Sequence, residues 1–152
     1  MNVMPGGPVV ATNGRRLRIM PPEGWVWHEI DVPRVPPSMN NNEIRSSWRG
    51  FQTLKKDWQS EVELMLMVHD IKREAYQRAI AGAWMRFDVR AGRRDSGNYS
   101  SLISKALGDA LDNYRAIPDD DDLHFFFTGT EFEGVTGTPR TRFVIALQPN
   151  DL

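Results

Sequence analysis

Hydrophobic positions recur at helical spacing in some segments of this chain and alternate with polar positions in others, which predicts both helices and strands. The clearest helix spans residues 99–114, where one face carries an unbroken apolar stripe. The stripe consists of Tyr99, Leu102, Ile103, Ala106, Leu107, Ala110, Leu111 and Tyr114. Asp95 or Asn98 can accept hydrogen bonds from the free N–H groups at its start, and Pro118 prevents the helix from continuing.

A longer helix is predicted from about residue 50 to about residue 68, because apolar residues return at helical spacing. These residues are Phe51, Leu54, Trp58, Val62 and Met65. Lys55 and Lys56 are expected to lie mostly on the solvated side of this helix. Residues 64–68 are apolar all round, which predicts burial on several sides near the helix end. The apolar positions of residues 71–80 indicate a further helical segment.

Strand patterns occupy much of the remaining chain. Residues 25–32 alternate between two faces, as a half-buried strand does. One face would carry Val26, His28, Ile30 and Val32, and the other Trp25, Trp27, Glu29 and Asp31. Alternation over residues 85–90 predicts a second strand, and the apolar segments 123–128 and 142–147 predict two more. This order of elements predicts an α+β fold, in which a small mixed β-sheet of about four strands packs with two or three helices.

Composition divides the chain into an arm, a domain and a tail. Residues 1–23 contain Gly-Gly-Pro and Pro-Pro and few apolar side chains, so we expect a flexible N-terminal arm. The arginines of this arm either touch phosphates or are merely solvated. Residues 24–148 are expected to form a single domain, followed by a C-terminal tail at residues 149–152. Residues 38–45 are polar and predict either an exposed loop or a binding loop.

The overall composition narrows the class of protein. A chain of 152 residues with 40% hydrophobic and 26% charged residues suits one soluble globular domain. The absence of cysteine excludes disulfides, thiolate nucleophiles and zinc-thiolate sites. Because the sequence carries no secretory signal pattern and no membrane-spanning apolar run, we expect a cytoplasmic protein with no membrane partner. A net charge of -1 argues against binding nucleic acid through overall charge, but local basic clusters still allow it.

Carboxylates flank the helix predicted for residues 99–114. Asp95 precedes the helix, and an acidic run from Asp119 to Asp122 follows it. Carboxylate oxygens from separate segments suit Mg²⁺, which can polarise a phosphodiester and activate water. Lys105 and Asp109 lie four residues apart and can pair on one helical face. Two simpler interpretations stay open, namely that the acidic run is a solvated turn and that Asp95 only caps the helix.

Four short motifs, in a fixed order, connect this chain to a known family. They are Pro36-Pro37-Ser38-Met39-Asn40, Arg94-Asp95-Ser96-Gly97-Asn98, Lys105-Ala106-Leu107-Gly108-Asp109-Ala110-Leu111 and Ile117-Pro118-Asp119-Asp120. Their order, and the spacing from Asp109 to Asp120, resembles the pattern of RusA-type Holliday junction resolvases, which are small dimeric endonucleases of bacteria and their phages. The resemblance extends from about Trp25 to Leu147.

This resemblance implies a RusA-like, dimer-forming fold and a function. The protein would be a homodimer that binds branched DNA in a bacterial or phage-infected cell. It would make paired nicks in four-way junctions with Mg²⁺, or alternatively Mn²⁺, as its cofactor. The implied catalytic residues are Asp95, Asp120 and Lys105. The implied metal ligands are Asp95 and Asp120, with Asp119 as their neighbour. Asp121 is one candidate for the acid that is missing at position 97, and Asp122, Asp88 or a water molecule are the others. The implied DNA-binding residues are Asn40, Arg45, Arg49, Arg93, Arg94 and Lys105.

The chain departs from the family pattern at two points. Gly97 stands where the family has the second carboxylate of its Arg-Asp-x-Asp-Asn motif, and the stretch from Asn98 to Lys105 is about four residues longer than usual. Three hypotheses therefore remain: a junction endonuclease, a protein of the same fold that binds DNA or a host protein without cleaving, and an interaction protein with no nucleic-acid role.

Overall fold

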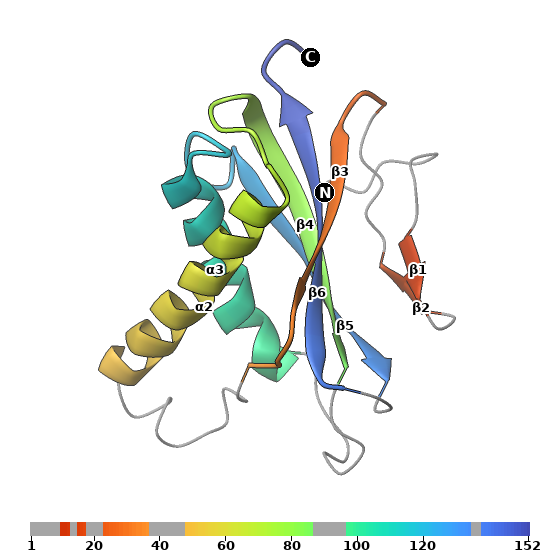
Figure 1. Ribbon diagram of the computed structural model, residues 1–152, viewed down its shortest axis with the longest axis vertical. Coiled ribbons are helices and arrows are strands. Elements are labelled where there is room, and N and C mark those ends of the chain that lie inside the picture. The colour runs from red at the N-terminus through yellow and green to blue at the C-terminus, as the bar shows by residue number, and fades with distance from the viewer. Residues whose placement is uncertain (1–9, 13–14, 18–22, 37–47, 87–96, 135–137) are drawn as a thin grey trace.

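The computed structural model describes residues 10–12, 15–17, 23–36, 48–86, 97–134 and 138–152. Figure 1 shows a twisted β-sheet with two helices packed against one of its faces. In chain order the elements are β1 (Val10–Thr12), β2 (Arg15–Leu17), β3 (Val26–Val32), α2 (Trp48–Val68), β4 (Tyr76–Arg86), α3 (Gly97–Tyr114), β5 (Phe125–Gly134) and β6 (Arg140–Pro149).

The main sheet is mixed and has the strand order β3-β6-β4-β5. β6 pairs antiparallel with both β3 and β4, whereas β4 and β5 are parallel. Parallel neighbours require a crossover connection, and α3 supplies it. For the described residues, the predicted α+β class is confirmed, with a small mixed sheet of about four strands and two helices. The RusA-like fold and dimer formation stay predictions.

The core lies between the sheet and the two helices. In β3, Ile30 and Val32 are fully buried on the helix side, whereas Glu29 and Asp31 are exposed, so the predicted alternation is confirmed. The predicted stripe of α3 is likewise buried from Leu102 onward. On the other face of the sheet a smaller apolar cluster forms around Ile80, Trp84, Val144 and Ala146, with Trp25 and Trp27 packed against it.

The prediction of a helical segment over residues 71–80 is wrong. The chain leaves α2 through a turn in which Asp70 and Glu74 have left-handed φ angles of 55° and 59°, and β4 then begins at Tyr76. β4 is bonded to strands on both sides, and its residues 79–85 are all buried. A strand buried on both faces has a continuous apolar run, which periodicity cannot distinguish from a buried helix.

The predicted all-round burial of residues 64–68 is also wrong. Leu66 is fully buried, but Leu64 and Met67 are each 56% exposed and Val68 is 66% exposed. The reason is that α2 packs against α3 and the sheet with one side only. The end of α2 therefore presents an apolar surface to solvent.

Two further segments concern the predicted domain limits. Within the predicted arm, β1 and β2 form a two-stranded antiparallel ladder, and β2 lies beside β4 and β5. In the predicted tail, the Asn150 N–H donates to the Ala75 carbonyl at 3.0 Å, and Gln77 donates to the Leu152 carbonyl at 3.0 Å. Among the described residues, no helix is both long enough and apolar enough to cross a membrane.

Candidate functional site

The acidic run folds back along α3 instead of continuing beyond it. The helix ends at Tyr114, and Arg115 takes a left-handed φ of 70° that reverses the chain. The returning segment places Asp120 beside Lys105, with 3.3 Å between the Lys105 Nζ and the Asp120 Oδ2. The acidic run therefore lies near the middle of the helix rather than at its end.

Gly108 permits this close approach. It is buried in α3, and a Cβ added there would lie 3.1 Å from the Phe125 ring and 3.5 Å from the Asp120 Cβ. The distance to the ring is tighter than nine in ten real Cβ contacts, so a larger residue would require the Phe125 ring to shift by a few tenths of an ångström. The glycine thus fixes how near Asp120 can come to the helix.

Two lysines and two aspartates form a chain of ion pairs across the helices. The Lys55 Nζ lies 2.8 Å from the Asp109 Oδ2, and the Lys105 Nζ lies 3.0 Å from the Asp109 Oδ1. Lys105 also contacts Asp120, as described above. The predicted pairing of Lys105 with Asp109 is therefore confirmed.

The prediction that Lys55 lies on the solvated side of its helix is wrong. Lys55 is only 7% exposed, because α2 packs along α3 and the lysine stem runs through the interface to reach Asp109. A signal for this burial exists in the sequence. Lys55 falls at helical spacing between Phe51 and Trp58, on the same stripe as the apolar residues.

The contacts of this cluster shift the pKa of its two aspartates in opposite directions. Burial by itself would raise the pKa of Asp109. Hydrogen bonds with Lys55, Asp120 and Lys105 outweigh that effect and lower the pKa below its ordinary value. For Asp120, the hydrogen bond with Asp109 and then burial raise the pKa, while Lys105 opposes them. The hydrogen bond to Asp109 is also the main cause that raises the pKa of Lys105, so its ammonium stays protonated.

Three carboxylates converge next to this chain of ion pairs. Asp112, Asp119 and Asp120 each offer an oxygen, and these oxygens all lie within 4.8 Å of one another. Asp112 is not among the residues that the sequence predicted. It lies one turn after Asp109 on α3, and that spacing is the signal that could have found it. Burial, followed by repulsion from Asp119 and Asp109, raises the pKa of Asp112.

Asp121 is directed elsewhere. Its Oδ1 accepts hydrogen bonds from the backbone N–H groups of Leu123 and His124, each at 3.1 Å, and lies 2.6 Å from the His124 Nδ1. The hydrogen bond with the His124 ring is the main cause that lowers the pKa of Asp121. The structure therefore places Asp121 in the turn before β5 and outside the group of converging carboxylates.

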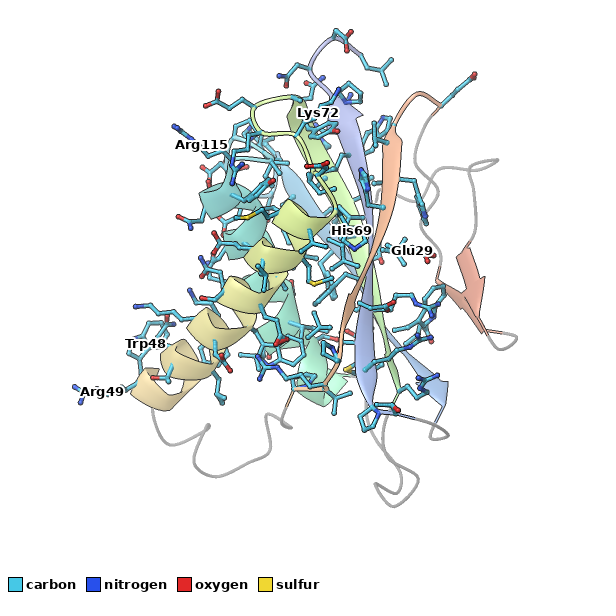
Figure 2. All side chains as sticks on the ribbon, in the orientation of Figure 1. Glu29, Trp48, Arg49, His69, Lys72 and Arg115 are labelled. Atoms are coloured by element: carbon cyan, nitrogen blue, oxygen red, sulfur yellow. The ribbon has the colours of Figure 1, made fainter. Side chains whose placement is uncertain are left out.

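Of the remaining predicted site residues, the structure describes only Arg49. Asp95, Arg93, Arg94, Asn40 and Arg45 lie outside the described residues. Arg49 is exposed in the first turn of α2, and Figure 2 shows it beside Trp48 at the end of that helix, away from the sheet.

The start of α3 differs slightly from the prediction. The helix begins at Gly97, so Asn98 lies inside its first turn rather than ahead of it. Of the residues named from the sequence, the structure thus brings together Lys105, Asp119 and Asp120.

A hollow between α3 and β5 opens onto this cluster. Its volume is about 390 Å³, which falls in the range of ligand sites. It is lined by Ser101, Ser104, Lys105, Gly108, Asp120, Asp122, Phe125, Phe126 and Phe127. The lining thus includes an ammonium, hydroxyls and carboxylates, which are groups that can bind a phosphate directly or through a metal ion.

Comparison with known proteins assigns no family. No protein-family model matches the chain, and no curated protein sequence matches it significantly. The resemblance to RusA-type resolvases therefore depends on the motifs of this sequence alone.

Proposed function

We propose that this protein is a Mg²⁺-dependent endonuclease of the RusA type, which cuts four-way and other branched DNA as a homodimer in a bacterial or phage-infected cell. The observation that carries the proposal is the convergence of Asp112, Asp119 and Asp120, of which Asp120 contacts Lys105 and lines the hollow with it. Two of these carboxylates and the lysine belong to the motifs that resemble the family.

The donor set fits the proposed ion. Mg²⁺ prefers hard oxygen ligands and is commonly held by a few carboxylates, with water and phosphate oxygens completing its octahedron. Asp112, Asp119 and Asp120 would hold it, and Asp95 would join them from outside the described residues. The bound ion would polarise the phosphodiester and lower the pKa of a water molecule. Asp112 supplies a carboxylate in a chain that has glycine at position 97.

Lys105 would bind the phosphate that is cleaved or its neighbour. Its ammonium has three N–H donors, and Asp109 and Asp120 accept from it at 3.0 and 3.3 Å. One donor is thus left to face a phosphate in the hollow. Because its pKa is raised, the charge is present at every physiological pH. Arg49 and the predicted Asn40, Arg45, Arg93 and Arg94 would add phosphate contacts along the duplex arms.

A second candidate function is recognition without cleavage. The observation that favours it is Gly97, which lies in the first turn of α3 and has no side chain to bind a metal. Such a protein would keep the same fold and bind branched DNA or a host protein. Junction binding without product would support this candidate over the first.

Cleavage of a synthetic mobile four-way junction tests the proposal. The wild-type protein should make paired, symmetric nicks with Mg²⁺ or Mn²⁺ and leave a linear duplex of the same sequence intact. Asp120→Asn should abolish the nicks, whereas the matched surface control Asp151→Asn should not. Equal cleavage by Asp120→Asn and wild type would show that this cluster is not the catalytic site.

A further inference from the structure

Lys55 is a buried cation that the proposed chemistry does not use. It lies on α2 and is 7% exposed, and its Nζ is 2.8 Å from the Asp109 Oδ2 and 3.1 Å from the Gln59 Oε1. Burying an ammonium is unfavourable unless it is paired and hydrogen-bonded, so its position is set by these partners. Lys55 itself is separated from Lys105 and the hollow by Asp109.

The two oxygens of Asp109 are divided between the two lysines. Lys55 takes the Oδ2, and Lys105 is left with the Oδ1 at 3.0 Å. Because each oxygen has its own lysine partner, the carboxylate is held between a lysine of α2 and a lysine of α3. Lys105 then has its second contact with the Asp120 Oδ2 at 3.3 Å, on the wall of the hollow.

We propose that Lys55 is a positioning residue for Lys105. By occupying one oxygen of Asp109, it prevents Lys105 from taking both oxygens and so holds the Lys105 ammonium against Asp120. The placement of Lys105 follows from the contacts alone, while its importance for cleavage rests on the proposed function. Without the Lys55 ammonium, Lys105 draws toward the freed Oδ2 and leaves Asp120.

A purely structural role is the alternative, because the Lys55–Asp109 pair also joins α2 to α3. The chain offers a matched control for that role. Asn113 on α3 donates to the Glu63 Oε1 on α2 at 2.7 Å, a second polar link between the same helices. Asn113→Ala removes this link without touching Lys105. Lys56→Met removes a neighbouring exposed lysine and controls for the change in charge.

The first readout is the Lys105 ammonium itself, observed by ¹⁵N–¹H NMR and assigned with Lys105→Arg. In the wild type this signal should be visible, because two carboxylates protect its protons from exchange with water. In Lys55→Met the Lys105 signal should shift and its protons should lose their protection from exchange. In Lys55→Arg the protection should be restored. Asn113→Ala and Lys56→Met should leave it unchanged. Should Lys55→Met fail to fold, Lys55→Gln provides the same readout, because it keeps a polar end in the interface.

The second readout is junction cleavage. Lys55→Met should lower kcat by about 10- to 100-fold with KM unchanged, as for residues that orient a reacting group. An unaltered Lys105 signal in Lys55→Met, or an equal loss in Asn113→Ala, would overturn the proposal. If the wild type does not cut junctions, the proposed function fails, and the NMR comparison still decides the role of Lys55.

Discussion

Asp112 is a carboxylate whose ionisation is less favourable in the folded protein than in the unfolded chain. Burial, and then the charges of Asp119 and Asp109, raise its pKa. A carboxyl whose pKa is raised on folding binds its proton more tightly in the folded state. It therefore costs stability above the folded pKa and none below the unfolded pKa.

Replacement of Asp112 should accordingly be stabilising when no divalent ion is present. Asp112→Asn is expected to raise the free energy of unfolding at neutral pH, and the gain should disappear as the pH falls to about 4, the ordinary range of an aspartate pKa. Urea unfolding of both proteins in a chelator, from pH 4 to 8, measures this difference. A variant less stable than wild type at pH 7 would show that Asp112 is held by favourable contacts instead.

Asp109 has the opposite dependence on pH. Hydrogen bonds with Lys55, Asp120 and Lys105 overcome the effect of burial and lower its pKa, so it stabilises the fold above the unfolded pKa. That contribution is lost as the pH falls through the lowered value. Asp109→Asn should destabilise the protein by about 1–3 kcal/mol at pH 7, because Lys55 loses its charged partner in the interface. The difference from wild type should shrink in acid, and a constant difference down to pH 2 would contradict the assignment.

At the scale of elements, periodicity predicted those with one buried stripe. The stripe of α3 and the alternation of β3 each pack against one layer, so their sequences carry a clear period. β4 is buried on both faces of the sheet, so its sequence shows no clear period, and an apolar run of this kind also fits a buried helix. The exposure of apolar residues at the end of α2 cannot be predicted from the sequence, because hydrophobicity alone does not show how many faces of a helix pack against other elements.

This one-sided packing of α2 gives a test with a matched pair. Leu66→Ala should lower the free energy of unfolding by about 2–5 kcal/mol, because Leu66 is fully buried. Leu64→Ala should change it by no more than about 0.5 kcal/mol, because Leu64 is 56% exposed. Denaturant unfolding of the two variants compares identical substitutions two residues apart. Equal losses would mean that Leu64 is covered in solution.

For the whole molecule, the site was predictable only where its residues stand in short motifs. Lys105, Asp119 and Asp120 were named from the sequence and converge in the structure. Asp112 and Lys55 were not recognised as site residues. The role of Asp112 depends on the fold-back of the acidic run, and that of Lys55 on the packing of α2 along α3. Asp95 lies outside the described residues, so its part in the site stays a prediction.

Calorimetric titration with Mn²⁺ tests most directly our proposal that Asp112, Asp119 and Asp120 hold a divalent metal ion. Wild type should bind the ion, and Asp112→Asn and Asp120→Asn should each weaken binding by at least about 10- to 100-fold, the loss seen even for residues that only support metal ligands. Asp121→Asn should bind as wild type does, because that carboxylate is engaged with His124. Equal affinity in all four proteins, or a loss in Asp121→Asn alone, would contradict the assignment.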